Sequence, residues 1–323
     1  MSIKDTLLGL AIGDAFGLGI EFKDRYWILK NIDFTKYVNA RGEKHGKNIL
    51  PGFYSDDTEH SIGVLNALMD KRPFSEELLL EKWKEEYGED EKRKGFPRQG
   101  HGSIKDYYTG EKTIGEIRNS QRDRDDPGNA PPMRAVPIGF APSGKINEYA
   151  IINADATHPH PKGRAASILV ARATEFILKK DGNQKNIIPY CKQFISDEET
   201  KDLLDETNKL PHPNQLNQKG LEKLCGPQPI PFMTKLGEIN GLPCASMRTG
   251  AASLYVLKHS ESAFEALQYS INMGGDIDSL ACICTGIMAG KYGLDSLPKF
   301  MLEEVEGKEK LEKLAYKFDS KIQ

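Results

Sequence analysis

Asn272-Met-Gly-Gly-Asp-Ile-Asp-Ser-Leu-Ala-Cys-Ile-Cys-Thr-Gly-Ile-Met-Ala-Gly-Lys-Tyr292 is the stretch that decides the fold of this chain. A glycine pair, two aspartates and a serine stand directly before an apolar run that carries no charge until Lys291. A helix that is apolar on every side has to be buried. The stretch therefore predicts a helix enclosed by the rest of the protein, with its polar residues gathered at its start.

The polar residues at this helix start have either a capping role or a role in binding a cation. Carboxylates there are stabilised by the helix dipole and by the free N–H groups of the first turn. Asp276 and Asp278 are two positions apart, however, and such positions do not face each other on a regular helix. They can converge on one point only if Asp276 still lies in the loop, with the chain bent around something such as a hard cation.

A second stretch, from Pro51 to His60, has the same design. It reads Pro-Gly-Phe-Tyr-Ser-Asp-Asp-Thr-Glu-His, so that glycine, a hydroxyl and paired aspartates again precede an amphipathic run. Apolar residues at helical spacing predict a helix from Asp57 to Asp70. Two oxygen-rich helix starts in one chain suggest one shared site.

Each stretch taken alone also fits ordinary capping. Asp56 followed by Glu59 fits a capping box, and Asp276 or Ser279 fits an N-cap. The two stretches together hold four aspartates and two serines. These groups exceed what two caps need, which favours a metal site.

The composition bounds the class of protein. The chain has 323 residues, 38% hydrophobic and 28% charged, with a formal net charge of −3. We expect one soluble domain over residues 1–323, monomeric and without the basic surface of a nucleic-acid-binding protein. The apolar run from Leu7 to Ile12 is too short for a signal-peptide core or a membrane span. Five scattered cysteines indicate reduced thiols and a cytoplasmic protein.

The fold class predicted is all-α, with loops gathered at one end, because no strand-like alternation extends beyond a few residues. The helices expected besides those above cover Asp5–Phe16, a run from Ser75 to Gly88, Asn147–Ala156, Pro161–Lys180, Ile187–Phe194, Asp197–Lys209, Leu221–Leu224, Cys244–Lys258, Ala263–Ile271 and one or two helices within Pro298–Ile322. Expected loops are Lys23–Leu50, with short helical pieces, a solvated charge run at Glu89–Lys94, and Leu210–Phe232.

Several polar positions admit more than one interpretation. Glu21, among glycines and apolar residues, suits a functional carboxylate as well as a buried structural one. His101 lies between two glycines and is interpreted as an exposed loop histidine. His158 and His160 are interpreted as part of a proline-stiffened joint, since no third nitrogen or sulfur ligand is nearby for zinc. The stretch Pro127–Gly139 is either an anion-binding loop or a plain turn.

Taken in order, these elements resemble the ADP-ribosylglycohydrolase family, which includes the glycohydrolase that reactivates nitrogenase reductase. The matching elements span most of the chain and are Gly9–Gly17 with Glu21-Phe22, Ser55-Asp56-Asp57-Thr58, Gly128-Asn129 with Met133-Arg134 and Pro137-Ile138-Gly139, Thr157-His158-Pro159, and Gly274-Gly275-Asp276-Ile277-Asp278-Ser279.

The resemblance implies an orthogonal multi-helix bundle with two magnesium or manganese ions in a cleft formed by loops at helix N-termini. The implied metal ligands are Ser55, Asp56, Asp57, Asp276, Asp278 and Ser279. The implied catalytic residues are Glu21 and Asp56, and the implied substrate-binding residues are Gly128, Asn129, Met133, His158, Gly274 and Gly275.

The reaction that the resemblance implies is hydrolysis of the bond between ribose C1 of ADP-ribose and a protein side chain, foremost arginine. Its partner would be an ADP-ribosylated protein or conjugate, with no nucleic acid and no membrane. The alternatives are hydrolysis of ADP-ribosyl-serine, of O-acetyl-ADP-ribose or of another ribosyl conjugate, and a relative that binds ADP-ribose without turnover.

The chain departs from the family pattern at a few positions. Ser55 and Ser279 replace threonines and keep the hydroxyl, and Ile277 replaces a threonine outside the implied ligands. Ala130-Pro131-Pro132 stands where the family has a second glycine and small residues. Because proline has no N–H to donate, this change bears on how the loop would hold a phosphate.

Overall fold

The computed structural model describes residues 3–39, 50–231 and 237–322, and in these ranges it contains helices and no strand. The all-α prediction is therefore confirmed. The α-helices are α1 (Ile3–Leu18), α2 (Arg25–Asn31), α3 (Asp56–Leu68), α4 (Glu76–Lys94), α5 (Ile104–Thr109), α6 (Ile114–Arg122), α7 (Ala130–Met133), α8 (Ile146–Asp155), α9 (Pro161–Thr174), α10 (Ile187–Lys192), α11 (Glu198–Asn208), α12 (Gln218–Cys225), α13 (Ser246–His259), α14 (Ala263–Ile271), α15 (Ile277–Tyr292), α16 (Lys299–Glu304) and α17 (Lys308–Ile322). Short 3₁₀ turns cover Val136–Phe140, Ser143–Lys145, Gln184–Asn186 and Pro213–Gln215, and a π turn, Glu175–Lys179, follows α9.

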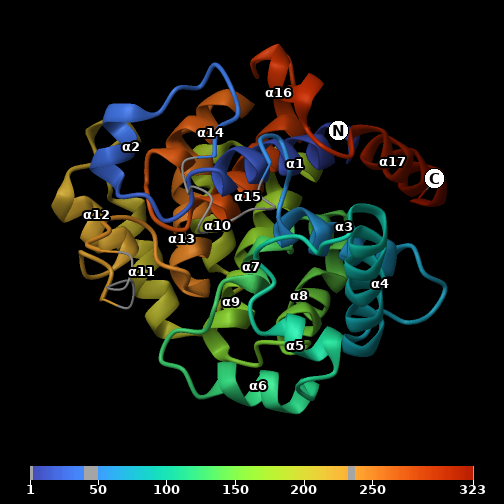
Figure 1. Cartoon of the computed structure of the whole chain (residues 1–323). Coiled ribbons are helices and arrows are strands. Elements are labelled where there is room, and N and C mark those ends of the chain that lie inside the picture. The colour runs from blue at the N-terminus through green and yellow to red at the C-terminus, as the bar shows by residue number, and fades with distance from the viewer. Residues whose placement is uncertain (1–2, 40–49, 232–236, 323) are drawn as a thin grey trace.

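The centre of the molecule is the pair formed by α1 and α15, which lie side by side (Figure 1). Three glycines of α1 allow this close packing. A Cβ added at Gly9 would come within 2.6 Å of Ala289, and one added at Gly13 within 2.2 Å of the Ala281 carbonyl oxygen. A Cβ at Gly17 would come within 2.4 Å of the Asp278 Cα atom. The packing therefore brings the end of α1 against the acidic start of α15.

A side chain at Gly13 is expected to disrupt this contact. For Gly13→Ala we expect the free energy of unfolding to fall by about 1–3 kcal/mol, because backbone atoms of α15 block the methyl group. Gly88→Ala is the matched control, since Gly88 is also inside a helix but has no atom within 4 Å of the added Cβ. That variant should gain about 0.5–1 kcal/mol. Urea unfolding of both variants checks the prediction, which fails if they change stability in the same direction.

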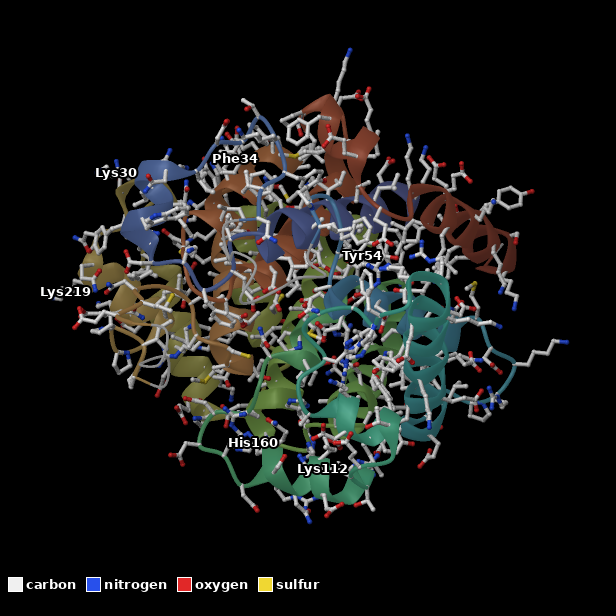
Figure 2. All side chains as sticks on the ribbon, in the orientation of Figure 1. Lys30, Phe34, Tyr54, Lys112, His160 and Lys219 are labelled. Atoms are coloured by element: carbon white, nitrogen blue, oxygen red, sulfur yellow. The ribbon has the colours of Figure 1, made fainter. Side chains whose placement is uncertain are left out.

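Other helices surround the central pair. Helix α14 packs along α15, α17 packs on α1, and α9 packs between α8 and α13. Helices α3 and α4 form a further layer, and α5 and α6 lie together at one end of the molecule, whereas α7 lies nearer the centre and packs on α9 (Figure 1). Figure 2 shows Tyr54, just before α3, in the interior, whereas Lys30 and Lys219 lie at the edge. The start of α3 is thus deep in the protein and close to the central pair.

The prediction that Glu89–Lys94 is a solvated charge run is correct for Glu89 and Glu91–Arg93, which are exposed, and wrong for Asp90. The predicted helix end at Gly88 is also wrong. Helix α4 continues through Gly88 to Lys94, and Asp90 in this part is buried. Asp90 accepts a hydrogen bond from Arg93 at 2.9 Å and contacts the buried guanidinium of Arg98. Asp90 is therefore buried as an ion-pair partner of these two arginines.

The remaining helix predictions agree with the structure to within a few residues, including the two C-terminal helices α16 and α17. All five cysteines are free. In the part of the chain that the structure describes, no helix is long and apolar enough to cross a bilayer. Residues 40–49 of the predicted loop Lys23–Leu50, and Phe232 of the loop Leu210–Phe232, lie outside the described residues.

Candidate metal centre

The start of α3 is capped by a hydroxyl group. Ser55 is the N-cap residue, and its Oγ accepts a hydrogen bond from the Asp57 backbone N–H at 3.2 Å. The capping-box interpretation of Asp56 and Glu59 is therefore wrong. Glu59 instead accepts a hydrogen bond from His101 Nε2, with the two atoms 2.6 Å apart. Asp56 and Asp57 are left in the first turn of the helix, both buried.

Asp14 of α1 holds the start of α3 in place. The sequence did not indicate this role. Its carboxylate accepts hydrogen bonds from the backbone N–H groups of Ser55 and Thr58, each at 2.9 Å, and from the Thr58 hydroxyl at 2.7 Å. Burial and the nearby charge of Asp278 raise the pKa of Asp14 to about 6. A carboxylate satisfied by three donors in this way links α3 rigidly to α1.

A glycine turn precedes α15, and two neighbouring segments of the chain form hydrogen bonds with it. Gly274 and Gly275 have φ values of 72° and 77°, a left-handed conformation that glycine adopts without strain. The Gly275 carbonyl accepts a hydrogen bond from the Phe22 N–H at 2.7 Å, and the Gly274 carbonyl accepts one from the Leu242 N–H at 2.8 Å. The turn therefore joins the chain just after Glu21 to the start of α15.

The turn brings three carboxylates together. Asp276 is at the N-cap position without a side-chain capping bond, and Asp278 is in the first helical turn. Asp276 thus lies in the loop and Asp278 in the helix, the arrangement that convergence requires. Carboxylate oxygens of Glu21, Asp276 and Asp278 lie within 4.8 Å of one another.

The electrostatics of these carboxylates favour a bound cation. Burial, with the charge of Asp278 adding to it, raises the pKa of Asp276 to about 8 and that of Asp57 well above its usual range. Burial also raises the pKa of Asp56 to about 7, against the opposing effect of His101. Among the described residues, neither lysine nor arginine forms an ion pair with these three aspartates. The Asp57 Oδ1 atom is buried without a hydrogen-bond partner. Oxygen donors of this kind suit magnesium or manganese.

These pKa shifts predict how stability depends on pH. Without cations the native state retains protons on Asp14, Asp56 and Asp276 that the unfolded chain has lost, because the three pKa values are raised to about 6, 7 and 8. Stability must then fall as pH rises, and we expect a loss of about 2–5 kcal/mol between pH 5.5 and 8 in chelator. Manganese should abolish most of this loss, since the ion replaces the protons. Urea unfolding at both pH values checks this, and an equal loss with and without manganese would contradict it.

A cavity of about 560 Å³ opens beside Asp56. Asp56 is the one acidic residue among those that line it, whereas the basic lining residues are His60, His101, Arg124, Arg134 and His158. The cavity is thus acidic at the candidate metal centre and rich in N–H donors elsewhere. This distribution is complementary to a ligand that carries hydroxyls at one end and anionic groups further along.

Asn129 connects the cavity wall to α15. Its Nδ2 donates hydrogen bonds to Asp276 Oδ2 at 2.7 Å and to Ser279 Oγ at 3.1 Å. Its Oδ1 accepts a hydrogen bond from the Cys244 thiol at 3.1 Å. The side-chain amide of Asn129 is therefore engaged in orienting the carboxylate and hydroxyl of α15, and Cys244 is a residue of this site that the sequence analysis did not single out.

The segment after Asn129 is a helix start, in which two prolines reduce the number of N–H groups that could bind an anion. Pro131 and Pro132 lie in the first turn of α7, where helical N–H groups would have no intrahelical partner. The Gly128 N–H donates to Gln121 Oε1 at 3.0 Å, so it is also occupied. Neither Gly128 nor the two prolines therefore has a free N–H group for an anion in this cavity.

The interpretation of His101 as an exposed loop residue is wrong, because only 7% of it is exposed. Its ring nitrogens contact the Arg98 carbonyl at 3.0 Å and Glu59 Oε1 at 2.6 Å. Burial alone would lower the pKa of His101, but the hydrogen bond and charge of Glu59 outweigh burial and raise it. Glu59, His60 and His101 also place ligating atoms within 4.8 Å of one another, and an ion pair between Glu59 and His101 accounts for their proximity.

The loop that carries His101 is anchored by Arg98, which donates hydrogen bonds to the Tyr54 carbonyl at 2.8 Å and to Glu306 at 2.6 Å. The loop then passes close to Asp56. The Asp56 N–H donates to the Gln99 carbonyl at 3.0 Å, and a Cβ added at Gly100 would lie 1.8 Å from Asp56 Oδ1. The backbone of the loop therefore fixes the orientation of the Asp56 carboxylate.

The other predicted substrate-binding residues fall into two groups. His158 and Met133 line the cavity together with Gly128 and Asn129. Gly274 and Gly275 are not among its lining residues, and their backbone groups bind neighbouring segments instead. His160 is the N-cap of α9 and accepts a hydrogen bond from the Lys162 N–H, which agrees with its interpretation as part of a joint.

Comparison with known proteins places this arrangement in a family. The chain is 24% identical over 350 residues to the human ADP-ribosylhydrolase ARH3, an alignment that covers 97% of this chain and 91% of that protein. It is 23% identical over 315 residues to the ADP-ribosyl-(dinitrogen reductase) glycohydrolase of Rhodospirillum rubrum, covering 94% of this chain and 90% of that protein.

The fold is shared with a solved structure described as an ADP-ribosylglycohydrolase-related protein complex. The two agree with a TM-score of 0.65 at 18% identity, over 100% of this chain and 99% of the other. The sequence profile for ADP-ribosylglycohydrolase matches residues 2–323, nearly the whole chain. The protein therefore belongs to the ADP-ribosylglycohydrolase family, a family of glycosyl-bond hydrolases.

Proposed function

We propose that this protein hydrolyses the bond between ribose C1 of ADP-ribose and a protein side chain, with divalent cations as cofactors. The observation that carries the proposal is the convergence of Glu21, Asp276 and Asp278 beside a cavity whose lining includes two arginines and three histidines. Carboxylates gathered at one end suit cations and ribose hydroxyls, and the basic residues suit a diphosphate.

Six residues at the starts of α3 and α15 would hold two magnesium or manganese ions: Ser55, Asp56, Asp57, Asp276, Asp278 and Ser279. The raised pKa values of Asp56, Asp57 and Asp276 support this assignment, because a cation is what permits so many buried carboxylates to ionise together. When bound, the ions would polarise the ribose hydroxyls and a water molecule, and would offset charge as the glycosidic bond breaks.

The side chains around the ions would have separate tasks. Glu21 would take the proton from the attacking water, since its carboxylate lies with Asp276 and Asp278 and is only partly exposed. Asp56, at the wall of the cavity, would orient the ribose through the cation that it binds. His158, and the segment Gly128–Met133, would position the diphosphate and its adjoining ribose.

The linkage that we propose first is ADP-ribosyl-arginine, in a protein substrate and in a cytoplasmic, monomeric enzyme. The Rhodospirillum rubrum relative is named for an ADP-ribosylated protein, dinitrogen reductase, which supports a protein conjugate as the substrate. Serine linkages, O-acetyl-ADP-ribose and other ribosyl conjugates are the alternatives, since they share the ADP-ribose portion that the cavity would bind.

Release of free ADP-ribose tests the proposal. We expect release from an ADP-ribosyl-arginine protein in magnesium or manganese and none in chelator, with an ADP-ribosyl-serine peptide and O-acetyl-ADP-ribose as parallel substrates. If only one of these parallel substrates is hydrolysed, the protein is still a hydrolase, but the linkage that it cleaves is not ADP-ribosyl-arginine. Tight binding of ADP-ribose without release from any conjugate would instead identify a non-catalytic binding protein.

A further inference from the structure

A chain of hydrogen bonds runs from a buried arginine to the cavity wall. Arg134, which is fully buried, donates from Nη2 to the Thr157 hydroxyl, with the two atoms 2.7 Å apart. The same hydroxyl lies 2.7 Å from His158 Nδ1. Asn153 in turn holds Arg134 with two oxygens. Its side-chain Oδ1 accepts a hydrogen bond from Arg134 Nε at 2.9 Å, and its backbone carbonyl accepts one from Nη2 at 3.0 Å. The position of the Arg134 guanidinium, the first donor in this series of hydrogen bonds, is therefore fixed.

The direction of the second hydrogen bond follows from the chemistry of the donors. A guanidinium has only N–H donors, so the Thr157 oxygen must act as the acceptor towards Arg134. The Thr157 hydroxyl still has one proton to donate, and Thr157 is 1% exposed. Within the described ranges, His158 Nδ1 is the one acceptor in hydrogen-bonding reach of that proton. The proton must point to Nδ1, because otherwise a buried O–H would lack a partner.

His158 is therefore an acceptor at Nδ1, and in a neutral imidazole the other nitrogen then carries the hydrogen. The ring is neutral because burial, and next the charges of Arg134 and Arg124, hold the pKa of His158 well below its usual range. Its Nε2 is on the side of Gly128, where an added Cβ would come within 3.2 Å. Both residues line the cavity, and no described residue accepts a hydrogen bond from Nε2.

We infer that Arg134 and Thr157 are positioning residues that lock His158 in its Nε2–H tautomer, so that Nε2 presents a fixed N–H donor to an oxygen of the ligand in the cavity. The inference rests on the proposed function only for the identity of that ligand, a nucleoside diphosphate sugar. Because the nearby Gly128 N–H and the prolines of α7 offer no free donor, the His158 N–H supplies one at this wall. A fixed tautomer avoids a ring rearrangement on binding.

Nitrogen NMR of the wild-type protein tests the tautomer without any ligand. In protein labelled with ¹⁵N-histidine, His158 should show an unprotonated Nδ1 and a protonated Nε2, its signals being assigned by their loss in His158→Gln. A protonated Nδ1, or equal shifts for the two nitrogens, would overturn the inference. Since this measurement needs no substrate and no turnover, it stands even if the proposed function fails.

Thr157→Val tests the positioning role, because it keeps the shape of the side chain and removes the hydroxyl. We expect His158 to lose its single tautomer and the Kd for ADP-ribose to rise about five- to tenfold, the usual effect of one hydrogen bond. Thr157→Ser restores the hydroxyl and should restore both the tautomer and the Kd. A tautomer unchanged in Thr157→Val would overturn the role of Thr157.

A double-mutant cycle separates positioning from a general structural effect. If Thr157 acts through His158, then Thr157→Val should leave the Kd for ADP-ribose unchanged in a His158→Ala background. A further loss of the same five- to tenfold size in that background would show that Thr157 affects binding by another route and would overturn the inference. If no variant and no wild-type protein binds ADP-ribose, the ligand assignment fails while the NMR result still decides the tautomer.

Discussion

Replacing Asp276 with asparagine is expected to lower the rate of ADP-ribose release by at least about 10³-fold and to reduce the number of tightly bound cations. The expected loss exceeds the roughly 10- to 100-fold typical of residues that only orient a metal ligand. Asparagine matches aspartate in shape and removes the charge. In addition, Asp276 Oδ2 accepts a hydrogen bond from Asn129 at 2.7 Å, so the new amide would turn its oxygen towards Asn129 and its NH₂ group towards the cation.

The measurement is the initial rate of release in saturating manganese, together with the manganese content of the purified protein by elemental analysis. Asp197→Asn is a matched control, because Asp197 caps α11 with a hydrogen bond from the Thr200 N–H at 2.8 Å and does not line the cavity. Asparagine caps helices as well as aspartate does, so the control should keep both stability and rate. Full cation content and rate in Asp276→Asn would exclude Asp276 as a ligand.

For Glu21→Gln we expect kcat to fall by about 10²- to 10⁴-fold, the range associated with loss of a general base. Glutamine keeps the size and hydrogen-bonding capacity of the side chain but accepts no proton at neutral pH. The Kd for ADP-ribose and the cation content should stay close to those of the wild type, because binding does not require the proton transfer.

The same variant separates two roles that the geometry allows. The Glu21 carboxylate lies within 4.8 Å of Asp276 and Asp278, close enough for it to serve as a further cation ligand. If the variant loses a cation along with its activity, Glu21 acts as a ligand and the assignment as the base is wrong. If kcat falls with full cation content, the role in proton transfer is supported. Single-turnover release together with elemental analysis gives both quantities.

The fold could be predicted because its signals are local and repeated. The apolar run after Ser279 has no polar face, and the structure encloses it as α15. The convergence of Asp276 and Asp278 was also predictable, since their spacing places them together only if the first lies in a loop. Glycine in α1 indicated close helix contact, and Gly13 lies against the backbone of α15.

The walls of the site could not be predicted, because they depend on pairs of residues far apart in the chain. Glu59 and His101 are neighbours only after folding, and a histidine between two glycines has no pattern that reveals a buried partner. Asp14 has a polar side chain inside an apolar helix and receives its donors from α3. Asp90 lies in a run of charged residues, yet it is buried because it forms an ion pair with the buried Arg98.

The pairing of α1 with α15 has a consequence for how the protein is made. Every residue of α1 from Thr6 to Leu18 is buried, and its main neighbour ends only at Tyr292. At about 5–20 residues per second, the ribosome needs roughly 15 to 55 seconds to synthesise the chain between them. During that time α1 lacks its main neighbour, and α3 contacts only a part of its buried surface. Nascent chains stalled before α15 would expose it and would depend on chaperones to stay out of aggregates.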